Sequence, residues 1–161
     1  MHDMRDYLSY DPQSGVFTWI KAPHPRIAIG AVAGHVRPDG YRRIRFRGRF
    51  YLAHRLAWWF VHGVMPPEID HRRGVAAGDG IENLRLATRS RNMANARLYC
   101  TNTSGFKGVG FRSRRDRWEA RLKVRGHRIH LGYFDTAGAA ARAYDAAAKE
   151  HFGDFARLNF N

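Results

Sequence analysis

The stretch IDHRRGVAAGDGIENLRLATRSRNMAN, residues 69–95, sets an aspartate beside a histidine and has asparagines at positions 83, 92 and 95. Such residues have an ordinary structural use, because Asp and Asn favour turns and helix caps. They also have a chemical use. Carboxylate and amide oxygens suit a hard cation such as Mg²⁺, which also binds substrate phosphate oxygens, and a neutral histidine can take a proton from water. A turn, a metal site and phosphodiester hydrolysis are therefore all open.

The elements around this stretch determine which side chains can meet. The pattern predicts a ββα unit, in which a strand, a loop, a second strand and the start of a helix occupy EIDH, RRGVAAGDG, IENLRLAT and SRNMANARL. Neighbouring residues on a strand point to opposite sides, so Asp70 and His71 would do different work. Asn92, just inside the helix, could face one of them. Asn83 could accept the hydrogen bond that orients the His71 ring.

Composition narrows the alternatives. The chain has 161 residues and a formal net charge of +14, from 28 Lys plus Arg against 14 Asp plus Glu, and such a surface attracts polyanions. The only cysteine, Cys100, excludes an intramolecular disulfide and a cysteine-rich zinc site, so metal ligands must be oxygen or imidazole. We expect an intracellular, cytoplasmic protein with no membrane partner, because the sequence contains no long apolar run and no signal peptide.

The residues before the ββα unit predict small β-hairpins followed by a helix. In GYRRIRFRGRFYLAH, alternation predicts an apolar face opposite a cationic face, with Gly48 in the hairpin turn. The expected apolar face contains Tyr41, Ile44, Phe46, Phe50 and Leu52, and the expected cationic face contains Arg43, Arg45, Arg47 and Arg49. The apolar segment 53–63 predicts a short buried helix that ends at Gly63.

The spacings from His71 to Asn83 and from Asp70 to Asn92, set around IENLRLAT and RNMAN, resemble the HNH nuclease family in the form of phage and intron-associated homing endonucleases. YLAHRLAWWFVHG and SYDPQSGVFTW resemble the segments that usually precede the motif in this group, so the resemblance covers about residues 7–97. It implies that Asp70 and Asn92 bind one Mg²⁺ or Mn²⁺ per active site, that His71 is the general base, and that Asn83 orients His71. Expected products carry a 3′-hydroxyl and a 5′-phosphate.

The loop after the Asp-His pair departs from those relatives. They usually carry Asn-Gly-Asp and then Asp-Asn-Arg, where this chain has RGV at 73–75 and GDG at 78–80. Asp79 is interpreted as a turn residue and Asn95 as a weaker alternative ligand. His54, a regular feature of such sequences, is interpreted as structural.

Composition shifts after LYCTNTSG, and the remainder predicts a second module. FKGVGFRS, RWEARLKVRG and HRIHLGYF predict three antiparallel strands, and TAGAAARAYDAAAKEHFG predicts a helix with Thr136 as its N-cap and Gly153 past its end. Alternation in the middle strand places apolar side chains toward the helix and cations outside. A cationic ribbon of this kind fits the DNA major groove, about 12 Å wide, while a merely solvated face is the alternative.

This second part resembles the Apetala-two/ERF DNA-binding domain over residues 104–160, through GFKGVGFR, RWEAR, HLGYFDTAGAAARAYDAAAKEHFG and ARLNF. The resemblance implies that Trp118 and Tyr144 belong to the core, and that His130 stands where the plant domain has tryptophan. The residues expected to face DNA are Lys107, Arg112, Arg114, Arg121, Lys123, Arg128 and His130.

Together these observations predict an α+β chain. We expect an HNH endonuclease domain over 1–98 with its ββα-metal core at about 65–98, a linker at 99–103, and an Apetala-two/ERF-like domain over 104–161. The expected function is that of a metal-dependent homing-type endonuclease of phage or mobile elements, which hydrolyses double-stranded DNA with sequence preference from the sheet and needs no organic cofactor. The alternatives are a non-cleaving DNA-binding regulator with an inactive HNH remnant, and an RNA-binding accessory protein.

Overall fold

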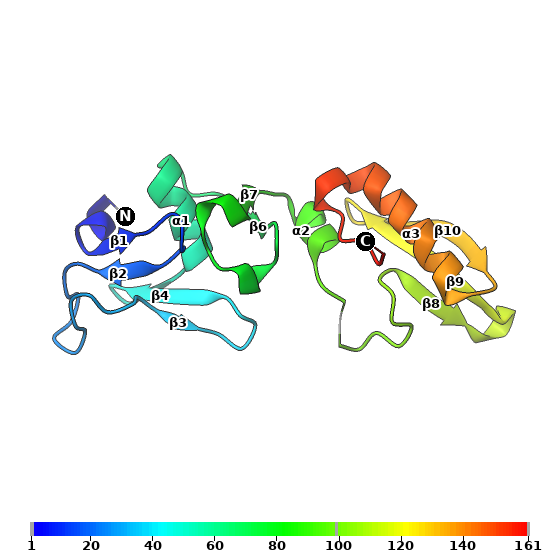
Figure 1. Ribbon diagram of the computed structural model, residues 1–161, viewed down its shortest axis with the longest axis horizontal. Helices are drawn as coiled ribbons and strands as arrows, with labels where there is room; N and C mark the ends of the chain where they lie inside the picture. The colour runs from blue at the N-terminus through cyan, green and yellow to red at the C-terminus, as the bar shows by residue number, and fades with distance from the viewer. Residues whose placement is uncertain (1, 99, 161) are drawn as a thin grey trace. The chain divides into compact units, whose positions relative to one another are not determined.

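The computed structural model describes residues 2–98 and 100–160; Met1, Asn161 and Tyr99 of the expected linker lie outside the described residues. Contacts divide the chain into two compact units, Met1–Ala87 and Thr88–Asn161. Each unit combines helix and sheet (Figure 1), which confirms the α+β class. The division falls before the helix of the expected ββα unit, so that helix is grouped with the second unit.

The first unit is built from short antiparallel pairs around one helix (Figure 1). Strand β1 pairs with β2, strands β3, β4 and β5 form a sheet in that order, and β6 pairs with β7. In chain order the elements are η1 (His2–Asp6), β1 (Leu8–Tyr10), β2 (Phe17–Trp19), β3 (His35–Val36), β4 (Arg42–Phe46), β5 (Arg49–Leu52), α1 (Ala53–His62), β6 (Ile69–His71), η2 (Val75–Ala77), η3 (Ile81–Asn83) and β7 (Leu84–Leu86).

The core of the first unit lies between these strands and α1. Phe17, Ile44 and Leu56 have no exposed surface, and they come from β2, β4 and α1. The helix ends where the sequence predicts, because Gly63 adopts a φ of 75° and donates its N–H to Trp59 O. This core fixes α1 and the small sheets relative to one another, and it thereby supports the loop between β6 and β7.

The β4–β5 hairpin corrects one predicted face. The two-residue turn 47–48 pairs Ile44 with Tyr51 and Arg45 with Phe50. Directly paired residues share a face. Tyr51 and Arg49 therefore lie on the side of Ile44 and Phe46, whereas Phe50 and Leu52 lie on the side of Arg43 and Arg45. Phe50 is 51% exposed, and the Arg43 guanidinium lies 3.9 Å from the centroid of its ring. Uninterrupted alternation through the turn predicts the opposite faces for β5, but the length of the turn sets the register of the second strand.

The second unit is a three-stranded antiparallel sheet backed by a helix, as the sequence predicts (Figure 1). Its elements are α2 (Arg89–Asn95), β8 (Val109–Arg112), η4 (Ser113–Arg115), β9 (Arg117–Val124), β10 (His127–Phe134), α3 (Ala137–Phe152) and η5 (Gly153–Phe155). Strand β9 lies in the middle. Helix α3 begins at its expected cap, because the Thr136 hydroxyl accepts a hydrogen bond from Ala139 N at 3.1 Å.

Small side chains let α3 lie close to the sheet. Ala140 and Ala141 of the helix and Ala120 of β9 are fully buried, and Leu122 packs with the buried Tyr144. This inner face leaves the opposite face of the sheet to charged residues. None of the helices in the described residues combines the length and apolar composition that crossing a bilayer requires.

Candidate active site and DNA-binding face

Strand β6 carries the two adjacent residues on which the site prediction depends. Asp70 pairs with Arg85 of β7, and His71 pairs with Leu84. Asp70 is 7% exposed and His71 is 4% exposed. The short β6–β7 ladder therefore buries both side chains at consecutive positions of a fixed strand.

Asp70 forms an ion pair with the neighbouring strand. Its Oδ2 accepts a hydrogen bond from Arg85 Nε at 2.8 Å and forms an ion pair with Arg85 Nη2 at 2.7 Å. Both side chains are almost completely buried. Charge-assisted contacts of this kind orient a carboxylate strongly. The guanidinium also offsets part of the negative charge that a metal ion would meet.

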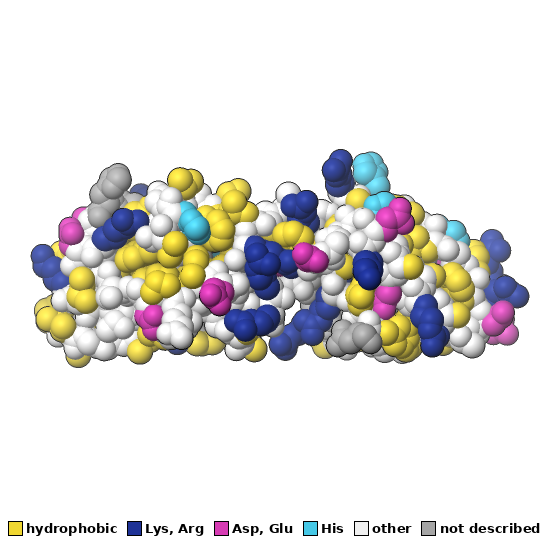
Figure 2. Space-filling view, turned by 45° about the horizontal axis from the view of Figure 1, so that its top comes forward, with side chains coloured by type: hydrophobic (Ala, Val, Ile, Leu, Met, Phe, Trp, Pro, Cys, Tyr) yellow, Lys and Arg dark blue, Asp and Glu magenta, His cyan; other side chains and the backbone are white. Residues whose placement is uncertain are grey.

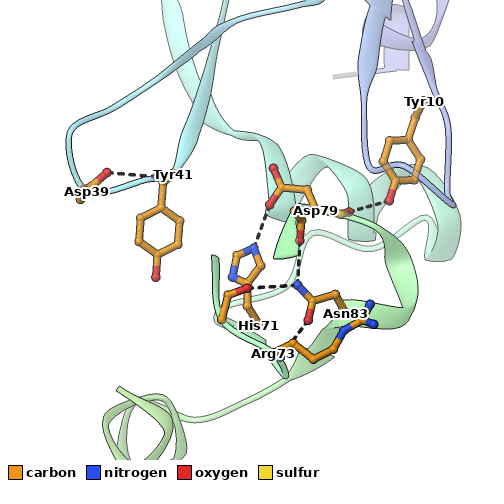
Figure 3. Close-up of polar contacts among 9 residues, drawn as sticks. Tyr10, Asp39, Tyr41, His71, Arg73, Asp79 and Asn83 are labelled. Atoms are coloured by element: carbon orange, nitrogen blue, oxygen red, sulfur yellow. Dashed lines mark hydrogen bonds and ion pairs between the residues drawn. The ribbon is translucent and has the colours of Figure 1, made fainter. Parts of the chain in front are cut away.

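The His71 ring contacts Asp79, the residue that the sequence suggests as a turn former. His71 Nε2 and Asp79 Oδ1 are 2.8 Å apart, and both side chains are buried (Figure 3). With the carboxylate as acceptor, Nε2 carries the proton in the neutral ring and Nδ1 carries the lone pair. In the sequence, the signal for this contact is a carboxylate between two glycines, in the loop that departs from the related nucleases. Only the tertiary fold shows that this carboxylate reaches His71.

Asn83 holds the backbone of the loop. Its Oδ1 accepts a hydrogen bond from Arg73 N at 2.9 Å, and its Nδ2 donates to Gly78 O at 2.8 Å and to Gly74 O at 3.3 Å (Figure 3). These contacts occupy the amide, so its hydrogen bonds go to the loop backbone rather than to the His71 ring. The loop that Asn83 closes is the one that carries Asp79.

The end of β1 and the loop that follows it also hold the Asp79 backbone in place. The Tyr10 hydroxyl donates to Asp79 O at 2.8 Å, and Ile81 N donates to Pro12 O at 2.9 Å. A Cβ added to Gly15 would lie 2.3 Å from both Asp79 C and Gly80 N. The absence of a side chain at Gly15 therefore permits the approach that positions Asp79.

We expect Gly15→Ala to lower the free energy of unfolding by more than the ~1–2 kcal/mol typical of a left-handed residue that gains a Cβ. Gly63→Ala is the matched control, because Gly15 and Gly63 share a φ of 75° while a Cβ on Gly63 would meet nothing within 4 Å. Chemical denaturation of both variants measures the difference. Equal losses would show that the contact between Gly15 and the loop is unimportant.

His54 of α1 lies against the His71 ring. The two ring centroids are 5.0 Å apart, and His54 is 5% exposed. Its Nδ1 is buried and has no hydrogen-bond partner among the described residues. Burial, followed by the nearby His71, lowers the pKa of His54 to about 4, so the ring is neutral at neutral pH. The sequence suggested a structural role, whereas the fold places this ring beside His71.

Asn92 and Asn95 lie on α2, which belongs to the second unit. Asn92 N donates to Thr88 O at 2.9 Å, and the Thr88 hydroxyl accepts from Arg91 N at 3.4 Å at the start of the helix. The pairing of Asn92 with Asp70 is a contact between units and stays a prediction. The oxygen atoms of the Asp70 carboxylate and the Asn92 carboxamide fit a hard cation, because both groups are ligands that Mg²⁺ accepts.

The outer face of the β8–β10 sheet carries cationic side chains around one carboxylate. Glu119, in the middle of β9, is 7% exposed. Its Oε2 accepts a hydrogen bond from Arg112 Nε at 2.5 Å and forms an ion pair with Arg121 Nε at 3.3 Å, and its Oε1 lies 3.0 Å from His130 Nδ1. Burial raises the pKa of Glu119, but the Arg112, Arg121 and His130 contacts outweigh it, so the net shift is downward.

Of the remaining residues expected to face DNA, three lie on the β9 and β10 strands or the adjoining turn, and Lys107 contacts the end of α2 instead. Lys123 pairs with Arg128 across β9 and β10, and Arg114 is exposed in η4. Lys107 instead directs its ammonium to the end of α2, where it donates to Ala94 O and, at 2.9 Å, to Ala96 O. Burial lowers the pKa of Lys107 to about 8. Lys107 thus fastens α2 to the rest of its unit, which the strand pattern alone does not reveal.

The comparisons with known proteins cover both parts of the chain. The family described as HNH endonuclease matches residues 51–94, which contain α1, the β6–β7 pair and its loop, and most of α2. A phage protein matches along nearly all of its own length, so the chain belongs to the HNH endonuclease family. That relative is Protein 3.8 of Escherichia phage T7, which is 32% identical over 115 residues, covering 68% of this chain and 94% of that protein.

Plant proteins match a shorter part. APETALA2-like protein 2 of Oryza sativa subsp. japonica is 48% identical over 61 residues, which are 38% of this chain and 14% of that protein. The AP2-like ethylene-responsive transcription factor TOE2 of Arabidopsis thaliana is 47% identical over 60 residues, which are 37% of this chain and 12% of that protein. The chain therefore spans about a seventh of the plant relatives, and it carries an AP2/ERF-like part beside its HNH part.

Proposed function

We propose that the chain is a metal-dependent endonuclease that hydrolyses phosphodiester bonds in double-stranded DNA. The observation that carries the proposal is the buried pair on β6, where Asp70 and His71 lie side by side and the His71 ring is held by Asp79 at 2.8 Å. This pair lies within the segment that matches the HNH endonuclease family. A fixed histidine and a carboxylate at consecutive positions of one strand can provide a base and a metal ligand.

In the proposed mechanism, His71 Nδ1 takes the proton of the attacking water. Asp79 keeps the opposite nitrogen protonated and stabilises the imidazolium that forms. Asn83 acts one step away, through the loop that it closes around Asp79. Asp70 and Asn92 would hold one Mg²⁺ or Mn²⁺, which stabilises charge on the phosphate and the departing 3′ oxygen when bound. The products would carry 3′-hydroxyl and 5′-phosphate ends.

The second unit would hold the duplex. Figure 2 shows Lys and Arg side chains spread over the visible face with fewer Asp and Glu side chains, in keeping with the net charge of +14. We assign DNA contact to the exposed face of β8–β10, where Arg112, Arg121, Lys123, Arg128 and His130 lie, and to Arg114 in the adjoining turn. A sheet face of this kind would supply the sequence preference of a homing-type enzyme, and the phage relative suits an origin in phage or mobile DNA.

A nicking assay on supercoiled plasmid tests this function. We expect wild-type protein to convert the plasmid to open circles with Mg²⁺ or Mn²⁺ and to lose this activity in EDTA. Kinase and ligase treatment of the products identifies their ends. One observation favours a non-cleaving DNA-binding regulator, namely the Arg85 guanidinium that already neutralises Asp70. If the protein shifts duplex DNA in a gel but does not nick it in the presence of any divalent ion, the regulator hypothesis is correct.

A further inference from the structure

Two imidazoles and a carboxylate from separate segments meet beside β6. His54 comes from α1, His71 from β6, and Asp79 from the loop before η3. One ligand atom from each residue lies within 4.8 Å of those of the other two, and all three side chains are buried. Segments distant in sequence thus bring three metal-ligating groups to one point, so local chain geometry does not account for the cluster.

The His54 ring supplies an independent observation. It is 5% exposed, and its Nδ1 has no hydrogen-bond partner among the described residues. Burying a polar nitrogen without a partner costs ~1–3 kcal/mol, so such an atom calls for an explanation. Helix α1 could have carried an apolar side chain at this position at lower cost. A ligand that the nitrogen binds provides that explanation.

We propose that His54, His71 and Asp79 form a binding site for a transition-metal ion such as Zn²⁺ or Co²⁺. Two imidazoles and one carboxylate, with water in the fourth position, are a donor set that Zn²⁺ accepts. Mg²⁺ prefers oxygen ligands throughout, so it would select Asp70 instead. His71 Nε2 and Asp79 Oδ1 are 2.8 Å apart, and one ligand atom of His54 lies within 4.8 Å of those of the other two residues. Closure around an ion therefore requires that the His71–Asp79 contact open slightly and that the His54 ring approach it.

Occupation of this site would remove the proposed base. When a metal takes the His71 nitrogen that faces Asp79, the proton on that nitrogen must move to Nδ1, which then can no longer accept a proton from water. The consequence rests on the proposed endonuclease function, whereas metal binding itself does not. The site would therefore inhibit cleavage, and low micromolar Zn²⁺ or Co²⁺ would act against Mg²⁺.

Titration of the full-length protein with Co²⁺ in excess Mg²⁺ tests the site without measuring cleavage. We expect one equivalent of Co²⁺ to bind and to give the visible absorption of a four- or five-coordinate site. His54→Gln and Asp79→Asn, which change size little and lie on separate segments, should each weaken binding at least about tenfold. Thermal melts of the metal-free variants test whether they are folded.

Two controls locate the ion. His62→Ala removes an exposed histidine from the same helix and should leave Co²⁺ binding unchanged. Asp70→Asn should also leave Co²⁺ binding unchanged, because Asp70 belongs to the proposed Mg²⁺ site. The proposal is overturned if wild type shows no visible band, if folded His54→Gln and Asp79→Asn proteins bind Co²⁺ as tightly as wild type, or if Asp70→Asn abolishes binding. A protein that binds Co²⁺ here but never nicks DNA would contradict the endonuclease function alone.

Discussion

Replacing His71 with alanine is expected to slow plasmid nicking by ~10²–10⁴-fold, the usual contribution of a positioned general base. DNA affinity should be unchanged, because the residues assigned to DNA contact lie on β8–β10 and its adjoining turn. The large effect follows from the geometry of the ring, which Asp79 orients at 2.8 Å within a buried environment. No other imidazole in the described residues makes this contact with Asp79.

Single-turnover nicking at saturating Mg²⁺ measures the loss, and a gel shift measures binding. His62→Ala serves as the control for removing a histidine from the same unit. Alanine at position 71 leaves the Asp79 carboxylate buried without its partner, which destabilises the fold. If the single variant unfolds, the double change His71→Ala with Asp79→Asn removes that charge and should be folded and inactive. A folded variant that nicks at the wild-type rate would show that His71 is not the base.

Local patterns predict the elements because each element depends on its own residues. Periodicity and caps predict the helix before Gly63, the β6 strand and the helix that begins after Thr136, all of which the structure contains. The second strand, expected over IENLRLAT, is shorter, because Ile81–Asn83 forms the 3-10 helix η3 and β7 covers only Leu84–Leu86. The predicted face of Phe50 is wrong, because the register across a two-residue turn depends on the pairing of the strands rather than on continuous alternation.

The surroundings of His71 were less predictable, because they depend on contacts between distant segments. Asp79 sits between glycines and therefore looks like a turn residue, yet Gly15 and Tyr10 hold its backbone where the side chain reaches His71. His54 lies 17 positions before His71 in the chain, and only the packing of α1 brings the rings together. Residue type could suggest these residues as candidates, while burial and distance assign their contacts.

Replacing Glu119 with glutamine is expected to raise affinity for unrelated DNA and to weaken discrimination between sequences. Glu119 orients Arg112, Arg121 and His130 on the face that we assign to DNA. Each well-placed bidentate arginine contact supplies ~1–3 kcal/mol of discrimination, so an arginine that loses its fixed direction costs about tenfold in specificity. Loss of one negative charge also favours contact with phosphates, and each added phosphate contact steepens the salt dependence by ~0.9.

Asp135→Asn is the matched control, because it removes the same charge from the same unit without touching Glu119. Asp135 pairs with Arg117 at 3.2 Å, and these side chains are 81% and 52% exposed, so this pair orients little. Selection from a random duplex library measures the preferred sequence for wild type and both variants, and binding at several salt concentrations measures the electrostatic part. Broader selection by Glu119→Gln but not by Asp135→Asn would separate orientation from net charge. If both variants select the wild-type sequence equally well, the Glu119 contacts serve the stability of the sheet rather than recognition.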